Sequence, residues 1–218
     1  MKFDSFEIIS NLLNDKEKRI IKLDHEIKEF VISNEMCYFL LANQSVISYQ
    51  FYNSEDLQQI STPDTIASIS CTSDKLYGST SHKIYQLAPT AILIHEFPSH
   101  QRIKKISSGL EHTAVLTTNG DLFTFGCGLR GQLGHGDVRS YETPVLVEAL
   151  AGIKIIDIAC GGFHTAAVSS FGDVYSFGWN TNGQLGLRKA PQGTFKMQDV
   201  KCQQVFTLPQ LIELEDEN

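Results

Sequence analysis

A gapless internal repeat is the feature that most constrains how this chain folds. Residues 106–134 read ISSGLEHTAVLTTNGDLFTFGCGLRGQLG and residues 158–186 read IACGGFHTAAVSSFGDVYSFGWNTNGQLG, with 13 of 29 aligned positions identical. The offset is 52 residues throughout, for instance from His112 to His164. Such a repeat predicts stacked copies of one supersecondary unit, because a single copy cannot bury its own hydrophobic face.

Each copy contains short β-prone runs that are separated by glycine turns, the pattern of an antiparallel meander. In the first copy the expected strands are 104–107, 113–117 and 121–125, with a short fourth strand after the corner Gly131–Gly134. In the second copy they are 155–159, 165–169, 173–177 and 183–186. Four strands with a period of about 50 residues predict a β-propeller blade, so we expect an all-β fold with little helix.

Two weaker copies lie upstream of the clear ones. The segments 45–49 and 83–87 match the third strand 173–177, and their leading strands are expected at 29–33 and 67–71. Both copies lack the Gly-x-x-His turn and the Gly-Gln-Leu-Gly corner. They are therefore interpreted as two degenerate blades.

Three motifs carry a resemblance to a known family: Gly109-Leu-Glu-His-Thr113, Gly126-Cys-Gly128 and Gly131-Gln-Leu-Gly-His-Gly136, with their copies. They resemble the regulator-of-chromosome-condensation repeat family, clearly over residues 103–188 and weakly over residues 25–100. The resemblance implies a seven-bladed propeller. It also implies a non-enzymatic protein-interaction scaffold, with no cofactor, no catalytic residue and no metal site.

Within that family the two clear units most resemble a small member with a single propeller domain. The segments 133–136, 144–150 and 177–180 carry this likeness. That member is associated with chromatin and with a JmjC-domain demethylase, so the resemblance implies such a partner and a location in the nucleus, on chromosomes, or in the cytoplasm. Two alternatives stay open, guanine-nucleotide exchange on a small GTPase and a non-functional fragment or isoform. Exchange would need an inserted β-wedge, and nothing interrupts residues 103–188.

The whole chain is expected to be one partial propeller, with about four of seven blades and an incomplete ring. Residues 1–20 would supply a closing strand, 25–100 two degenerate blades, 103–188 two well-matched blades, and 189–218 a linker toward a missing blade. An open ring exposes an unpaired blade face and strand edges. We therefore expect marginal stability or self-association.

Alternate turns of a meander lie on the same face, and this places variable residues of both clear blades together. The candidate partner-binding residues are Leu110, Glu111, Leu129, Arg130, Phe163, Thr181 and Asn182. Exposed Phe and Arg are enriched at interfaces. In the alternative interpretation Phe163 packs on the adjacent blade and Arg130 pairs with Glu111, while Trp179 packs between blades.

The repeated glycines and histidines are interpreted as structural. These positions are Gly109, His112, Gly126, Gly131, Gly134, Gly161, His164, Gly178, Gly183 and Gly186. A metal or acid–base role for the histidines is disfavoured because each belongs to a different blade, so we expect each ring to bond backbone and fill the space between blades. The letters G-x-G-x-x-G at 126–131 fit a dinucleotide motif, but more glycine follows where a helix is required.

Charge and cysteine content narrow the class further. The net charge of −7 disfavours general attraction to phosphates, and the N-terminus shows no basic tail, so we do not expect direct nucleic-acid binding. Five widely spaced cysteines without a C-x-x-C pair indicate reduced, buried thiols. No apolar run has the length of a membrane span and no signal peptide is evident, so we expect an intracellular protein that does not enter membranes.

Overall fold

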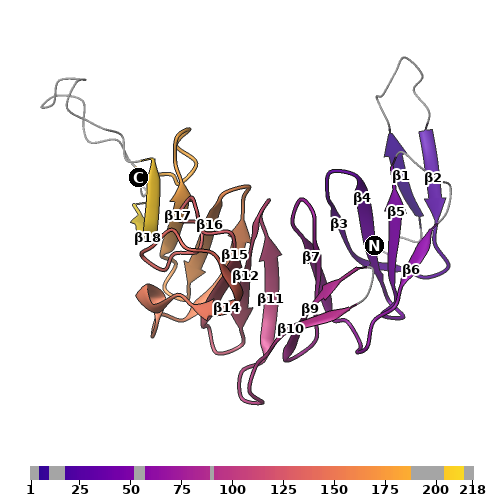
Figure 1. The fold of residues 1–218 in the computed structure, drawn as a ribbon, viewed down its shortest axis with the longest axis horizontal. Coiled ribbons are helices and arrows are strands. Elements are labelled where there is room, and N and C mark those ends of the chain that lie inside the picture. Colours follow the sequence, from indigo (N-terminus) through magenta and orange to yellow (C-terminus); the bar gives the residue numbers. More distant parts are fainter. Residues whose placement is uncertain (1–4, 10–17, 52–56, 89–90, 188–203, 214–218) are drawn as a thin grey trace, which may run out of the picture.

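Four antiparallel sheets of four strands each make up most of the fold, so the predicted all-β propeller fold is confirmed. The computed structural model describes residues 5–9, 18–51, 57–88, 91–187 and 204–213. Figure 1 shows the sheets side by side in an arc, with β1 and β2 at one end and β18 at the other. Within the described residues the arc does not close into a ring.

We number the sheets as blades 1 to 4 in chain order. Blade 1 contains β3 (Ile27–Ile32), β4 (Met36–Leu41), β5 (Val46–Gln50) and β6 (Gln58–Ile60). Blade 2 contains β7 (Ser68–Cys71), β8 (Leu76–Ser79), β9 (Lys83–Leu87) and β10 (Ile92–Glu96). Blade 3 contains β11 (Ile103–Ser108), β12 (His112–Thr117), β13 (Leu122–Gly126) and β14 (Tyr141–Leu146). Blade 4 contains β15 (Ile155–Cys160), β16 (His164–Ser169), β17 (Val174–Trp179) and β18 (Val205–Ile212).

In every blade each strand pairs with the next along the chain. The first strands β3, β7, β11 and β15 contact one another in order, so they form the inner wall of the arc. One 3-10 turn, η1 (Glu148–Leu150), is the helical element among the described residues. The expected first and third strands of the two degenerate blades are present as β3, β5, β7 and β9.

The fourth strands differ from the sequence prediction. The corners Gly131–Gly134 and Gly183–Gly186 are turns, and their glycines have φ between +68° and +77°, which a β-ladder does not accommodate. The strands that pair with the third strands of these blades come later in the chain and are β14 and β18. The expected strand at 183–186 is therefore wrong, because these residues form a turn. The expected linker at 189–218 is also wrong over Val205–Ile212, which form β18. Residues 188–203 and 214–218 lie outside the described residues.

The N-terminal segment forms a pair of its own. Strand β1 (Ser5–Ile9) pairs antiparallel with β2 (Lys18–Lys22) in a two-stranded sheet. Residues 1–4 and 10–17 of the expected closing segment lie outside the described residues. The closing role of residues 1–20 stays a prediction.

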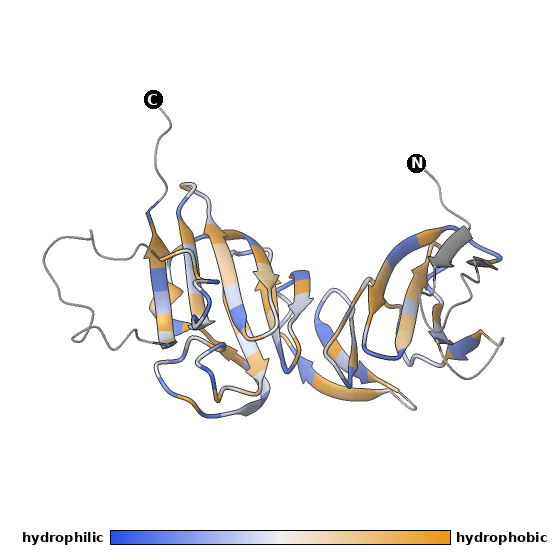
Figure 2. Cartoon of the chain, turned by 90° about the horizontal axis from the view of Figure 1, so that it is seen from above, coloured by the Kyte–Doolittle hydropathy of each residue, from blue (hydrophilic) through white to orange (hydrophobic). Residues whose placement is uncertain are grey.

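Blades pack face to face through apolar side chains. Between blades 3 and 4 the core contains Ala114, Leu116 and Leu122 on one side and Ala167 and Phe177 on the other. Figure 2 shows hydrophobic residues concentrated along the blade strands. Each blade thus buries its faces against its neighbours, as repeat architectures require.

The Gly-x-x-His turn has a direct steric cause. A Cβ added to Gly109 would lie 2.5 Å from His112 Cε1, and one added to Gly161 would lie 2.1 Å from His164 Cε1. In both turns the glycine N–H donates to the histidine carbonyl, at 2.8 and 2.9 Å. The glycine is required because the imidazole ring occupies the space of a side chain.

The degenerate blades keep this turn with other residues. The N–H of Thr72 donates to the carbonyl of Lys75, and the N–H of Ser33 donates to that of Met36, each at 2.9 Å. Neither Lys75 nor Met36 places an imidazole over the turn, so glycine is not needed there. The repeat therefore persists in the backbone where the letters have changed.

His112 links blade 3 to blade 4. Its side chain is buried, and Nε2 lies 2.8 Å from the Thr165 hydroxyl. That hydroxyl donates to the carbonyl of Gln132, also at 2.8 Å, so Nε2 must carry the proton that it donates to Thr165. The expected hydrogen bond to backbone is thus replaced by one to a hydroxyl of the next blade. His164, the equivalent residue of blade 4, is only partly buried.

The four described thiols are free, but only Cys37 is buried, while Cys71, Cys127 and Cys160 are partly buried, so the expectation of buried thiols is wrong for these three. Cys71 and Cys160 occupy the same register position at the end of the first strand, opposite Leu76 and Thr165. Burial raises the pKa of each of these two thiols to about 11, and that of Cys37 to about 12. The protonated thiols act as small apolar groups. Cys202 lies outside the described residues.

The first prediction concerns Gly109→Ala. The new methyl group would also lie 2.2 Å from the Gly161 carbonyl oxygen, which is backbone of the next blade. We expect a loss of unfolding free energy of about 1–3 kcal/mol in urea titrations, as for overpacked cores. Gly162→Ala is the control, because its methyl would meet only the flexible end of Leu110 at 3.2 Å. Equal losses in both variants would contradict the steric role of Gly109.

The second prediction concerns acid stability. Burial, and secondarily the nearby His164, lowers the pKa of His112 from 6.5 to about 4. Between these pH values only the unfolded chain takes up this proton, so stability is full above pH 6.5 and falls as the pH drops toward 4. The loss is on the order of 3 kcal/mol. Urea titrations across this range should show a shallower decline for His112→Gln, and parallel curves for both proteins would refute the assignment.

Candidate partner-binding face

The seven predicted partner-binding residues lie on turns at one side of blades 3 and 4. The structure brings Glu111, Arg130 and Phe163 into contact, while the N–H of Leu110 donates to the carbonyl of Gly162 at 3.0 Å. Thr181 and Asn182 follow Trp179 and are exposed. The N–H of Asn182 donates to the side chain of Gln184 at 2.8 Å, within its own turn. Use of these residues in binding stays a prediction.

Arg130 fastens the third-to-fourth strand connection of blade 3 onto blade 4. Its Nη1 donates to Glu111 Oε2 at 2.9 Å, and its Cζ lies 4.0 Å from the centroid of the Phe163 ring. The Trp179 centroid is 5.6 Å from the same Cζ, and the two aromatic rings meet edge to face at 5.5 Å. This is the geometry of the alternative interpretation, in which Phe163 and Trp179 pack and Arg130 pairs with Glu111.

The corner that follows Arg130 lies between the two blades. The Gln132 side chain is fully buried, and its oxygen accepts the N–H of Arg130 at 2.8 Å. A Cβ on Gly134 would lie 2.7 Å from Cε2 of Phe177, so the corner packs directly on the ring of the next blade. The Thr124 hydroxyl donates to the Leu133 carbonyl at 2.6 Å, which ties the corner to its own blade as well.

Apolar side chains remain in solvent around this cluster. Leu129 is 65% exposed and Leu110 is 42% exposed, although both sit on turns that hydrogen bonds fix. The Arg130 and Glu111 side chains are themselves more than one-third exposed. Arginine and tryptophan are enriched among interface hot spots, and here they lie beside two exposed leucines.

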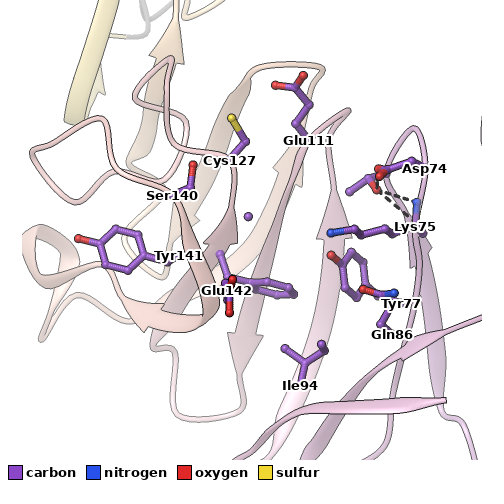
Figure 3. Close-up of a pocket in the computed structure, with 13 residues that line it drawn as sticks. Asp74, Lys75, Tyr77, Gln86, Ile94, Glu111, Cys127, Ser140, Tyr141 and Glu142 are labelled. Atoms are coloured by element: carbon purple, nitrogen blue, oxygen red, sulfur yellow. Dashed lines mark hydrogen bonds between the residues drawn. The ribbon is translucent and has the colours of Figure 1, made fainter.

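A groove of about 580 Å³ opens on the same side, between blades 2 and 3. Figure 3 shows Lys75 and Tyr77 on one wall, Cys127, Ser140 and Glu142 on the other, and Glu111 at one end. The lining carries the carboxylates of Asp74, Glu111 and Glu142 against the single ammonium group of Lys75. Burial, together with the charge of Asp74, raises the pKa of Tyr77 to about 12, so its hydroxyl stays protonated.

Sequence reasoning missed this groove. Asp74 and Glu142 belong to no motif, and the repeat motifs that contain Glu111 and Cys127 do not indicate a groove. The available signal was the connection between the third and fourth strands, which has 4 residues (88–91) in blade 2 and 14 (127–140) in blade 3.

The local backbone explains the G-x-G-x-x-G pattern at residues 126–131. Gly126 has φ +103°, and a Cβ there would lie 2.7 Å from the Glu111 carbonyl oxygen. The following residues form turns and lead into β14, with no helix that could face a pyrophosphate. In the part of the chain that the structure describes, no three His, Cys, Asp or Glu side chains are grouped to hold a metal ion. No described helix is long and apolar enough to cross a membrane.

The third prediction measures the Arg130 contact. Arg130→Ala and Phe163→Ala, alone and combined, form a double-mutant cycle for urea unfolding. We expect a coupling energy of about 0.5–1 kcal/mol, the range for a partly exposed cation on an aromatic ring. Arg130→Ala with Leu129→Ala is the control cycle, because no stacking on Phe163 involves Leu129. Coupling of zero in the first cycle would show that the stacking does not hold the corner.

Two family models match the C-terminal half of the chain. Both are described as regulator of chromosome condensation (RCC1) repeat, and they match residues 119–168 with 172–218 and residues 103–132 with 155–184. Together these matches span residues 103–218, which is more than half of the 218 residues.

Curated relatives agree with this match. RCC1 domain-containing protein 1 of Mus musculus is 42% identical over 86 residues, which are 39% of this chain and 23% of the mouse protein. RCC1 domain-containing protein 1 of Homo sapiens is 39% identical over 101 residues, 46% of this chain and 27% of the human protein. The match thus spans about a quarter of each of these relatives.

A solved structure shares the fold. Prp20p from Saccharomyces cerevisiae superposes with a TM-score of 0.73 at 16% identity, over 92% of this chain and 54% of the yeast chain. This likeness shows the fold alone. The repeat matches, the related sequences and the blade architecture lead to one conclusion: the chain belongs to the regulator of chromosome condensation (RCC1) repeat family.

Proposed function

We propose that this chain is a non-enzymatic interaction module that binds a protein partner on the turn face of blades 3 and 4. The observation that carries the proposal is the pair of exposed leucines, Leu110 and Leu129, beside the Arg130–Phe163 contact. A surface whose backbone is already fixed loses little conformational entropy on binding. Apolar groups held there gain by leaving water.

For the identity of the partner, we propose a JmjC-domain histone demethylase and a role on chromatin in the nucleus. The support is the resemblance to RCC1 domain-containing protein 1 over the two clear blades. The proposal therefore rests on likeness, and the exposed residues of the face supply the surface on which it can be tested.

Nucleotide exchange on a small GTPase is the second candidate. The yeast protein Prp20p, which shares the fold, has binding properties to Gsp1p and histones. Against this candidate, the described turns of blades 3 and 4 contain no additional strand pair that could form a wedge. Faster release of labelled GDP from a small GTPase would favour exchange over scaffolding.

The fourth prediction tests the face with Leu129→Asp. Purified chain is titrated with a JmjC demethylase domain, and the dissociation constant is measured by calorimetry. A charge at a desolvated apolar contact should weaken binding roughly tenfold or more. Circular dichroism should show an unchanged fold, because Leu129 is mostly in solvent.

Phe171→Asp is the matched control. Phe171 is 86% exposed and lies between β16 and β17, on turns of the opposite side of blade 4. Its replacement should change affinity by less than about twofold if the proposed face binds. The reverse outcome, with weak binding only in Phe171→Asp, would move the site to the other side.

A further inference from the structure

The repeat allows two blade junctions of this chain to be compared directly. In blade 3, His112 pairs with Gly126 and Thr113 with Phe125, and in blade 4 His164 pairs with Gly178 and Thr165 with Phe177. By this register the residues Glu111, Phe125, Gly126 and Cys127 of blade 3 correspond to Phe163, Phe177, Gly178 and Trp179 of blade 4. The same wall therefore faces blade 2 at one junction and blade 3 at the other.

At the junction of blades 3 and 4 the chain itself covers this wall. Arg130 stacks on Phe163, and Gly134 packs on Phe177. A Cβ on Gly178 would lie 3.2 Å from the Cα of Gln132. Residues 130–134 thus fill the junction as a basic turn that contains glycine.

At the junction of blades 2 and 3 the equivalent wall is open beside Glu111 and Cys127, whereas Phe125 is buried against the ring of Tyr77 of blade 2, with centroids 5.2 Å apart. Blade 2 has only four residues between its third and fourth strands, too few to form the corner. The four equivalent residues Glu111, Phe125, Gly126 and Cys127 instead line the groove of about 580 Å³. Thr113, the counterpart of Thr165, bonds to the Ser108 hydroxyl at 2.9 Å in place of a corner carbonyl.

The charge of the open wall indicates what would occupy it. Glu111 stands where the other junction has Phe163, and Asp74 and Glu142 add two more carboxylates against Lys75. Glu111 already holds Arg130, whereas the carboxylate of Glu142 has no hydrogen-bond or ion-pair partner among the described residues. The net charge of −7 also attracts cations over longer distances. A basic group is therefore the favoured occupant.

We infer that this groove is the docking site for a protein loop that presents an arginine or lysine within a turn containing glycine, in the place that residues 130–134 take at the next junction. The inference rests on the proposed function and deepens it, because it adds a class of partner segment. Volume is sufficient, since pockets that enclose ligands span about 300–1,000 Å³.

The chain supplies its own probe. A synthetic peptide with the sequence of residues 128–136, GLRGQLGHG, is titrated into the full chain at low salt, beside a peptide with glutamate in place of the arginine. We expect saturable binding of the first peptide only. Glu142→Lys should weaken it roughly tenfold, because charge reversal in a groove acts on binding at low ionic strength. Glu148→Lys, an exposed charge reversal in η1, should stay within about twofold.

A footprint locates the bound peptide. Cys127 lines the groove, so iodoacetamide labelling of this residue, followed by mass spectrometry, should slow on peptide addition. Equal binding of the two peptides, equal affinity in Glu142→Lys and the native chain, or unchanged labelling of Cys127 would each overturn the inference. Absence of any peptide binding would overturn it as well.

The two proposals fail separately. Leu129 does not line the groove, so Leu129→Asp should leave peptide binding unchanged while it weakens capture of the demethylase domain. Capture that depends on Leu129 without peptide binding would retain the proposed function and reject the groove. If the chain neither captures the demethylase domain nor binds the peptide, the proposed function and the groove are both rejected.

Discussion

The packing of each blade against the next is the constraint on which this structure depends. Ala114 and Leu116 are fully buried because blade 4 lies against them. Their counterparts Ala166 and Val168 point to the other side of β16, where no described blade lies, and they are only partly buried. The stabilising unit is therefore the junction between two blades and not the single sheet, as in other repeat proteins.

Polar groups inside a junction fix the loops at its rim. The hydrogen bonds from His112 to Thr165 and from Thr165 to Gln132 connect two strands and one corner in a buried chain. The ring of His112 in turn requires glycine at position 109. A buried hydrogen-bond chain of this kind holds its members in one arrangement. These buried hydrogen bonds consequently fix the backbone of the turn face, which can expose apolar side chains without changing its conformation.

The sequence was sufficient for the strands that repeat and insufficient for what neighbours supply. The glycine turns that repeat from Gly109 to Gly161 predicted the first three strands of both clear blades, because the residues of each turn determine where the neighbouring strands begin and end. The fourth strands β14 and β18 begin only where pairing with the third strand resumes, and no local residue marks that point. The Thr165 partner of His112 lies 53 residues away, so the ring's hydrogen bond was assigned to backbone instead.

The groove escaped prediction for a related reason: it arises from a corner that blade 2 does not have. Thr72 and Lys75 keep the turn hydrogen bond of a regular blade. Blade 2 therefore keeps its fold without the motif residues and lacks only the corner that would fill the junction with blade 3. At the same register position, the junction of blades 3 and 4 has Phe163 covered by Arg130, and the junction of blades 2 and 3 has Glu111 at the end of an open groove. Divergence within a repeat can therefore change a packed junction into a binding surface while the strands on both sides stay in place.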